Sequence, residues 1–246
     1  MYRLTALALC LVAHAAFAVT ADELANKNIE AKGGAEKLHA LHSVRLSGKM
    51  RIQNDTLELG VVTLVRSPDS VRYEATLQGL TEVQSFDGRQ AWQINPFQGR
   101  KDPEKLSADD AKGLAEDAAD FKGPLVDYSS KGYKLDYLGT EDIDGTEAHK
   151  LRVTRPNGDI TTVYLDPDHF LEIRIINRRI EHGVPNETVT DLGDYEQVQG
   201  VYLAFAQESG RSGSTERQKV QYDKADANPD IPEDAFHLPA AAAPAR

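Results

Sequence analysis

The chain has 246 residues, with 28 Lys and Arg against 39 Asp and Glu, so its net charge is −11 at pH 7. This acidic balance argues against a nucleic-acid partner, because binding to the phosphate backbone needs a concentrated basic surface. A content of 40% hydrophobic and 27% charged residues is typical of a globular protein and argues against intrinsic disorder.

The first eighteen residues have the three-part pattern of a secretory signal peptide. Met1-Tyr2-Arg3 is a short basic start, the stretch 4–18 is almost entirely apolar, and Ala16-Phe17-Ala18 supplies the small residues that a signal peptidase reads. We therefore predict cleavage after Ala18 and export to a bacterial periplasm. The only cysteine, Cys10, lies in this segment, so the exported chain would have no disulfide and no thiol nucleophile.

Helical patterns occur at the start and in the middle of the exported chain. Residues 21–41 have apolar residues at helical spacing, with a possible break at Gly33-Gly34. A second helix is predicted over 107–120, because Ser107 is a typical N-cap residue and acids follow it in the first turn. Residues 124–128 are expected to start a further helix. The stretch 102–120 holds seven acids and two lysines, which we interpret as a solvated acidic face.

Between and after these helices, apolar residues alternate with polar ones, as in strands with one dry face. The alternation is clear in 44–52, 71–77, 171–175 and 201–205. Turn signals that favour antiparallel hairpins separate such runs: Asp87-Gly88, Asp144-Gly145 and Asn157-Gly158. On this pattern we predict about eleven strands spread over the part of the chain from 43 to 225.

These elements predict an α+β, mainly β fold. Because an antiparallel sheet with alternating faces must cover its apolar side, we expect a curved sheet whose concave face is covered by the helices. We expect one domain over 19–238, followed by a disordered, alanine-rich tail at 239–246. The pattern permits a cavity between the sheet and the helices but does not demonstrate one.

A search for catalytic or metal-binding motifs finds none. Glu36, His39 and His42 are three residues apart, which can place ligands on one helix face, but a surface position is the preferred interpretation. The acidic runs 142–145 and 166–168 lack the rest of a calcium loop and are interpreted as turns. We predict no cofactor, no metal and no enzymatic activity, with a hydrolase using paired carboxylates as a remote alternative.

In its order of motifs the chain resembles the LolA-like outer-membrane lipoprotein-sorting proteins. The resemblance covers nearly all of the exported chain, and each motif alone is ordinary strand-and-turn sequence. The motifs are Val71-Arg72-Tyr73-Glu74, Gln84 to Gly88, Trp92 to Phe97, Gly139-x-Glu141-Asp142-x-Asp144-Gly145, Ala148-x-Lys150-Leu151, Asn157-Gly158, Tyr164-Leu165-Asp166, Leu171-Glu172-Ile173, Asp194-Tyr195-x-x-Val198-x-Gly200-Val201 and Ile231-Pro232-x-x-x-Phe236.

The resemblance implies an incomplete antiparallel barrel whose helices plug the concave side, and an apolar cavity that shields acyl chains. It implies no metal, nucleotide or catalytic residue. One departure is Ala204, which stands before Phe205 where these proteins often have proline. The candidate cavity-lining residues, for each of which plain core packing is the alternative, are Val44, Leu46, Met50, Val71, Tyr73, Leu77, Trp92, Ile94, Phe97, Leu151, Val153, Leu171, Ile173, Ile175 and Phe205.

The function expected on these grounds is a periplasmic carrier of lipoproteins or other lipids toward the outer membrane. Its expected partners are an acylated lipoprotein or lipid cargo and proteins of the inner and outer membranes, with only transient membrane contact and a monomeric state. The main alternative is a sensor or protein-interaction module on the same fold, which would use the acidic surface to bind a partner.

Overall fold

The computed structural model describes residues 19–239, so the predicted signal peptide and residues 240–246 of the predicted tail lie outside the described residues. The helices are α1 (Ala21–Ala31), α2 (Ala35–Ala40) and α3 (Ala108–Ala119), with short 3-10 helices η1 (Pro96–Gln98) and η2 (Glu233–Ala235). The strands are β1 (Ser43–Ile52), β2 (Leu57–Arg66), β3 (Ser70–Leu77), β4 (Leu80–Asp87), β5 (Ala91–Asn95), β6 (Arg100–Lys105), β7 (Lys134–Ile143), β8 (Thr146–Thr154), β9 (Ile160–Leu165), β10 (Glu172–Glu181), β11 (Val184–Val198), β12 (Val201–Arg211) and β13 (Gln218–Ala227).

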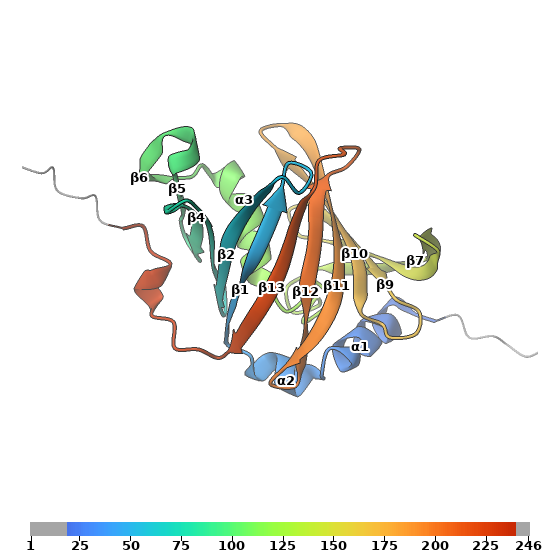
Figure 1. Cartoon of the computed structure of the whole chain (residues 1–246). Helices are drawn as coiled ribbons and strands as arrows, with labels where there is room; N and C mark the ends of the chain where they lie inside the picture. The colour runs from blue at the N-terminus through green and yellow to red at the C-terminus, as the bar shows by residue number, and fades with distance from the viewer. Residues whose placement is uncertain (1–18, 240–246) are drawn as a thin grey trace, which may run out of the picture.

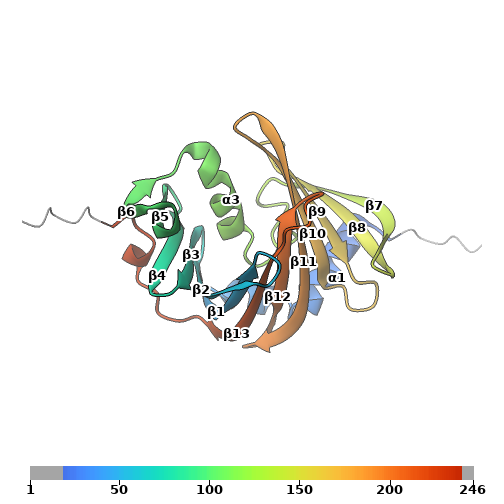
Figure 2. The ribbon, with the colours of Figure 1, turned by 45° about the horizontal axis from the view of Figure 1, so that its top comes forward.

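All thirteen strands belong to one sheet in the order β6-β5-β4-β3-β2-β1-β13-β12-β11-β10-β9-β8-β7 (Figure 1). Strands that follow one another in the chain pair as antiparallel neighbours, except β6 and β7, and β13 pairs with β1 as well as with β12. The last strand therefore joins the two halves of the chain at the centre of the sheet. The sheet curves strongly (Figure 2). It does not close into a barrel, because its edge strands β6 and β7 do not pair with each other. The predicted fold class is confirmed.

The N-terminal helical segment divides where its glycines predicted a break. Thr20 and Glu23 form a capping box that starts α1, in which each side chain bonds the backbone N–H of the other residue. Gly33 and Gly34 both have positive φ, +119° and +91°. At Gly33 a Cβ would lie 2.1 Å from the Gly200 carbonyl oxygen, so only glycine allows this corner to pack against the β11–β12 turn.

The central helix is confirmed, and the helix predicted after it is wrong. Ser107 caps α3 by accepting a hydrogen bond of 3.1 Å from the Asp110 N–H. Residues 124–128 instead form turns. Gly123 and Asp127 have φ of +106° and +56°, and a right-handed helix cannot pass through these left-handed positions.

The strands predicted from alternation correspond to β1, β3, β10 and β12, and all three predicted turns connect antiparallel neighbours. At Asp144-Gly145 both residues have positive φ, as a two-residue hairpin turn requires. The structure has thirteen strands, more than the approximately eleven predicted. An element such as β6, with the sequence Arg-Lys-Asp-Pro-Glu-Lys, has no apolar alternation, and its proline suits an edge strand.

Each helix covers a different part of the concave apolar face. Leu24 of α1 packs with Leu151 and Val163 of β8 and β9. Leu38 of α2 packs with the beginnings of β1 and β12, and Leu114 of α3 packs against β2, β3 and β5. The space between the helices and the central strands is not filled by these three clusters.

Candidate functional site

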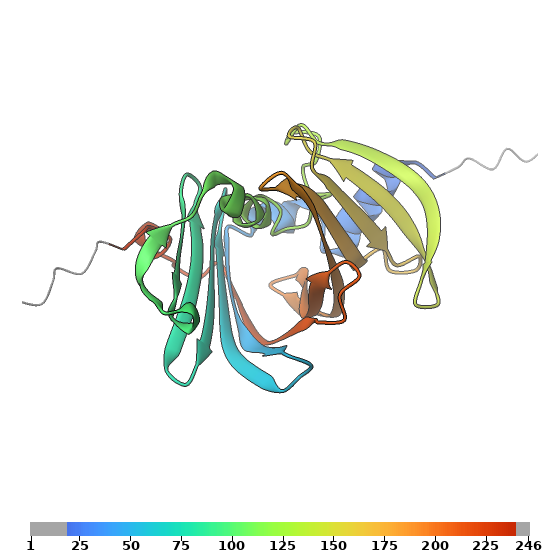
Figure 3. The same ribbon diagram turned by 90° about the horizontal axis from the view of Figure 1, so that it is seen from above.

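A cavity of about 730 Å³ lies between α3 and the concave face of the central strands. In the view of Figure 3, α3 lies above, with β1–β3 on one side and β10–β12 on the other. The segment 120–124, which follows α3, also contributes to the lining. Val44 and Leu114 line the cavity and also belong to the clusters that pack beneath α2 and α3.

Strands β1–β3 form an apolar wall of the cavity. Its register places Val44 opposite Val65, Gly48 opposite Val61, and Val61 opposite Ala75. Two hydroxyl groups within this half of the lining, those of Thr63 and Tyr222, hydrogen-bond to each other at 3.0 Å. We call the following residues the apolar wall: Val44, Leu46, Met50, Val61, Val65 and Ala75.

Strands β10–β13 contribute a group of uncharged polar side chains to the cavity lining, beside the charged Glu172 and Arg179 and several aliphatic residues. Asn177 lies opposite Thr188, Thr190 lies opposite Ser209, and Ser209 lies opposite Gln218, so the polar residues are cross-strand neighbours. We call the following residues the polar wall: Asn177, Thr188, Thr190, Gln207, Ser209 and Gln218.

Helix α3 contributes two acidic residues to the cavity lining, Asp110 in its first turn and Asp117 near its C-terminal end. Asp117 lines the cavity and accepts a hydrogen bond of 3.0 Å from the Tyr73 hydroxyl. The Asp117 side chain is open to the cavity, and the protein around the cavity desolvates its carboxylate. Desolvation raises the pKa of Asp117, and the Tyr73 hydrogen bond lowers it in part. Desolvation also raises the pKa of Tyr73 well above its ordinary value.

A network of ion pairs attaches α3 and its C-terminal turn to the far half of the sheet. Arg155 Nη1 lies 2.6 Å from Asp120 Oδ2, and Arg155 Nε lies 3.8 Å from Glu116 Oε2. Arg179 reaches the same Glu116 oxygen at 3.6 Å. Burial raises the pKa of Glu116, although both arginines favour its charged form. Glu116 Oε1 and Arg155 Nε are buried without a hydrogen-bond partner among the described residues.

A second buried pair lies at the edge of the cavity. Lys32, at the C-terminus of α1, places Nζ 2.8 Å from Glu172 Oε1, with the two side chains only 9% and 1% exposed. The Tyr195 hydroxyl donates to Glu172 Oε2 at 3.2 Å, and burial raises the pKa of Tyr195 well above its ordinary value. The three residues border the cavity and connect α1 to β10 and β11.

The β10–β11 hairpin contacts the first turn of α3. His182 Nε2 lies 2.8 Å from Asp110 Oδ1, and Lys112 Nζ donates to the Ile180 carbonyl at 3.0 Å. The hydrogen bond to Asp110 is the largest of the effects that raise the pKa of His182. The N-terminal end of α3 is therefore held by charges on the surface, whereas its C-terminal end is held by buried ones.

The structure brings five of the candidate lining residues to the cavity. These are Val44, Leu46, Met50, Tyr73 and Ile175. Four others are fully buried in packed regions: Val71 beneath α3, Leu151 and Val153 beneath α1, and Trp92, whose Nε1 donates to the Phe236 carbonyl at 2.8 Å.

The remaining six candidates also lie outside the cavity lining. Phe205 is buried, and Ile173 packs in a separate cluster that includes Tyr164. Phe97 lies in η1 between β5 and β6, and its side chain is 41% exposed. The other three are Leu77, Ile94 and Leu171, each partly buried.

Sequence reasoning did not identify the polar wall or the Lys32–Glu172 pair. The polar wall does leave a faint signal, because hydroxyl residues recur at alternate positions in Thr188-Val189-Thr190 and polar ones in Gln207-Glu208-Ser209. Such a pattern normally indicates a wet outer face. Only the curvature of the sheet turns these side chains toward an enclosed space.

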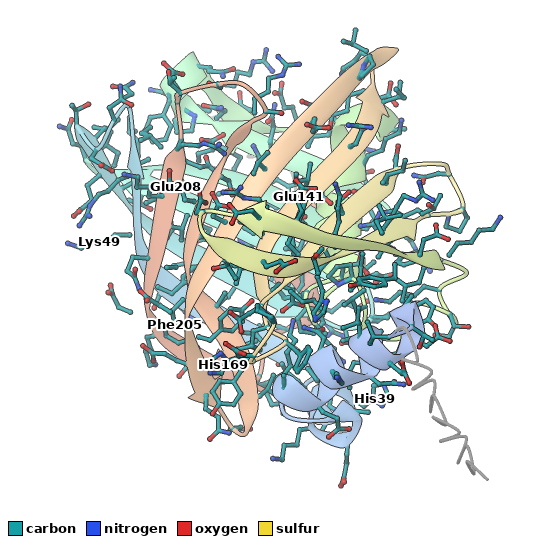
Figure 4. The ribbon with its side chains drawn as sticks, turned by 90° about the vertical axis from the view of Figure 1, so that its right-hand side faces the viewer. His39, Lys49, Glu141, His169, Phe205 and Glu208 are labelled. Atoms are coloured by element: carbon teal, nitrogen blue, oxygen red, sulfur yellow. The ribbon has the colours of Figure 1, made fainter. Side chains whose placement is uncertain are left out.

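The histidine and acidic motifs occur in ordinary structural settings. His39 lies on α2 with its side chain 54% exposed, and its Nε2 is 3.0 Å from both carboxylate oxygens of Asp127 (Figure 4). Asp166 accepts hydrogen bonds from the Asp168 and His169 N–H groups, which confirms its predicted turn. Across residues 19–239, no three His, Cys, Asp or Glu side chains gather closely enough to hold a metal ion.

Comparisons of sequence find no similar protein, whereas comparisons of structure do. No family model and no curated protein matches the sequence. A LolA superfamily protein from Nitrosomonas europaea superposes with a TM-score of 0.57 at 15% identity, covering 89% of this chain and 98% of that one. An outer membrane lipoprotein-sorting protein domain from Vibrio parahaemolyticus gives 0.58 at 13% identity, covering 86% and 97%. A DUF1329 family protein from Desulfovibrio piger gives 0.51 at 10% identity, covering 89% and 97%.

The chain thus has the fold of the LolA superfamily: a curved, open antiparallel sheet with helices on its concave side. The resemblance predicted from the motifs is confirmed at the level of the fold. Within the part of the chain that the structure describes, none of the helices has the length and apolar character needed to span a bilayer.

Proposed function

We propose that this protein is a periplasmic carrier that holds the acyl chains of a lipoprotein or another lipid in the cavity beneath α3. The observation that carries the proposal is the cavity itself. Its volume of about 730 Å³ lies within the range of small-molecule binding sites, which is roughly 300–1,000 Å³. An apolar wall of six aliphatic side chains gives an acyl chain a surface to lie against.

The energetics of burial support a carrier. Each methylene removed from water contributes about 0.8 kcal/mol, so ten buried methylenes contribute about 8 kcal/mol before the cost of ordering the chain. This affinity needs no specific polar contact with the chain. Met50, which is unbranched and flexible, lets the wall adapt to different chains.

The fold and the N-terminal sequence support the location and the partners. Two proteins of similar structure are described as a LolA superfamily member and an outer membrane lipoprotein-sorting domain. The signal-peptide pattern of residues 1–18 would deliver the chain to the periplasm, where cargo must cross an aqueous space. Donor and acceptor proteins at the two membranes would then load and unload a monomeric carrier.

The proposal is tested by native mass spectrometry of the protein purified from the periplasm, together with a displacement assay. N-phenyl-1-naphthylamine, an uncharged apolar dye, should fluoresce when bound, and a diacylated lipopeptide should displace it. Absence of co-purified lipid, together with no displacement by the lipopeptide, would refute the proposal.

A paired substitution locates the binding. Ala75 lines the cavity and Thr76, its neighbour on β3, is exposed and outside the lining. The A75W variant should fill part of the cavity and lose most of the dye signal, whereas T76W should bind dye as the wild type does. Equal binding by both variants would place the dye elsewhere.

A further inference from the structure

The two walls of the cavity differ in chemistry, and this difference bears on what the cavity holds. The apolar wall consists of aliphatic side chains, although strands β2 and β3 also place Thr63, Tyr73 and Glu74 on the cavity lining. The polar wall presents three amides and three hydroxyls, and the only charged lining residues described on the same strands are Glu172 and Arg179 of β10. Leu192 and Val220 are the cross-strand neighbours of Gln207. The lining is therefore apolar on both sides of this polar residue.

The polar wall retains hydrogen-bonding capacity. Thr190 and Ser209 hydrogen-bond to each other at 2.9 Å, and Asn177 Oδ1 accepts from Thr161 at 2.8 Å. Within residues 19–239, the side chains of Gln207 and Thr188 make no hydrogen bond to another side chain or to the backbone. An occupant that replaced the water on these groups would need donors and acceptors of its own, since an unpaired polar group costs free energy when it is desolvated.

The charged groups of the lining disfavour an anion. Both lining cations are already paired, Lys32 with Glu172 and Arg179 with Glu116. Among the lining acids, Asp117 and Glu82 form no ion pair within the described residues, and each accepts hydrogen bonds only from neutral side chains. A carboxylate or phosphate head would therefore find no unpaired cation in the lining with which to form an ion pair.

We infer that the occupant is an uncharged amphiphile whose head carries hydroxyl or amide groups, with its chain on the apolar wall and its head on the polar wall. The cavity discriminates against anionic amphiphiles of the same chain length. This inference rests on the proposed function, because it assumes that an acyl chain occupies the cavity.

A cationic head fits the lining less well than a neutral one. Asp117 already accepts a hydrogen bond from Tyr73, and desolvation favours its neutral form. Glu82 already accepts from Gln84 and Asn95. The polar wall itself offers no negative charge.

The inference is tested with three amphiphiles that share a twelve-carbon chain: monolauroylglycerol, laurate and dodecylamine. Each is titrated at pH 8 against the full exported chain loaded with N-phenyl-1-naphthylamine. Monolauroylglycerol should displace the dye at a concentration about tenfold lower than laurate, because a carboxylate that is desolvated without a counter-charge costs free energy. Equal or better displacement by laurate or dodecylamine would overturn the inference and leave the carrier function standing. No displacement by any of the three would refute both.

Substitutions at Gln207 test the position of the head. Q207L should weaken monolauroylglycerol about fivefold, the effect of one neutral hydrogen bond, and leave laurate unchanged. Q207K should tighten laurate binding by placing a cation in the polar wall. The matched controls are Q197L and Q197K, because Gln197 is an exposed residue of β11 outside the cavity lining.

Dye binding by each variant verifies that it is folded. Unchanged selectivity in both Gln207 variants would place the head away from the polar wall and refute the inference.

Discussion

Lys32 is the C-cap residue of helix α1, and its ammonium group forms a buried ion pair with Glu172 at the start of β10. The two residues are 140 positions apart in the chain, so the pair connects the N-terminal helix to the second half of the sheet. Lys32→Met removes the cation and keeps an apolar stem of similar length. We expect this single change to destabilise the protein strongly, because it leaves the Glu172 carboxylate buried without its counter-charge.

The expected loss follows from the burial of the pair. Breaking a buried ion pair by removing one partner costs about 3–5 kcal/mol. Tyr195 still donates to Glu172 Oε2 in the variant, which places the expected value near the lower limit, about 3 kcal/mol. With a urea slope of about 2 kcal/mol per M, the unfolding midpoint should fall by about 1.5 M.

Urea denaturation followed by circular dichroism measures this shift. Glu172→Gln in the Lys32→Met background should restore much of the stability, since the amide is neutral and still accepts the Tyr195 hydrogen bond. Lys49→Met is the control, because Lys49 and Glu58 form an exposed pair whose loss should have no measurable effect. If the urea midpoint of Lys32→Met were as close to that of the wild type as the midpoint of Lys49→Met is, the reasoning would be refuted.

Three further predictions concern the glycine corner, the cavity carboxylate and the surface contact of α3. Gly33→Ala should lower the thermal midpoint by several degrees, because its Cβ would meet the Gly200 carbonyl oxygen at 2.1 Å, whereas Gly60→Ala, which meets nothing within 4 Å, should be tolerated. Asp117→Asn should raise the urea midpoint at pH 7 relative to the wild type and have little effect at pH 3. A carboxyl whose folded-state pKa is raised favours folding when protonated, and that advantage is lost as the pH rises through the raised pKa. Equal effects of Asp117→Asn at both pH values would contradict this assignment. The contact of His182 with Asp110 and Asp109 should be fully formed below the ordinary histidine pKa and weaken as the pH rises through the raised value, seen as faster amide exchange in the first turn of α3. The His182→Gln variant is the control: its amide exchange in this turn should rise with pH only as fast as the intrinsic exchange rate does. A steeper rise would show that another group controls the turn.

Much of the fold was predictable because its signals are local. Asp144-Gly145 adopts a two-residue turn since both positions tolerate positive φ, and Ser107 caps α3 with its own side chain. The alternation in residues 71–77 identified β3 and its dry face. The helix expected at 124–128 was wrong because Gly123 and Asp127 have left-handed backbone conformations that their residue types permit but do not require.

The cavity lining was only partly predictable, for a physical reason. Val153 and Met50 both lie at apolar positions of alternating strands, yet α1 covers Val153 and the cavity borders Met50. Alternation shows which face of a strand is dry, and it does not show whether a helix or a hollow covers that face. That depends on where helices 21–31 and 108–119 pack across the curved sheet.

By itself, then, the sequence determined the local elements, the turns that join them and the apolar face that they share, because these depend on residues close together in the chain. The tertiary structure alone decided that β13 lies between β1 and β12, that Lys32 meets Glu172, and that the polar side chains of β10–β13 face aliphatic ones on β1–β3. Each of these juxtapositions joins segments that are distant in the chain. They arise from the curvature of the whole sheet, which no local pattern encodes.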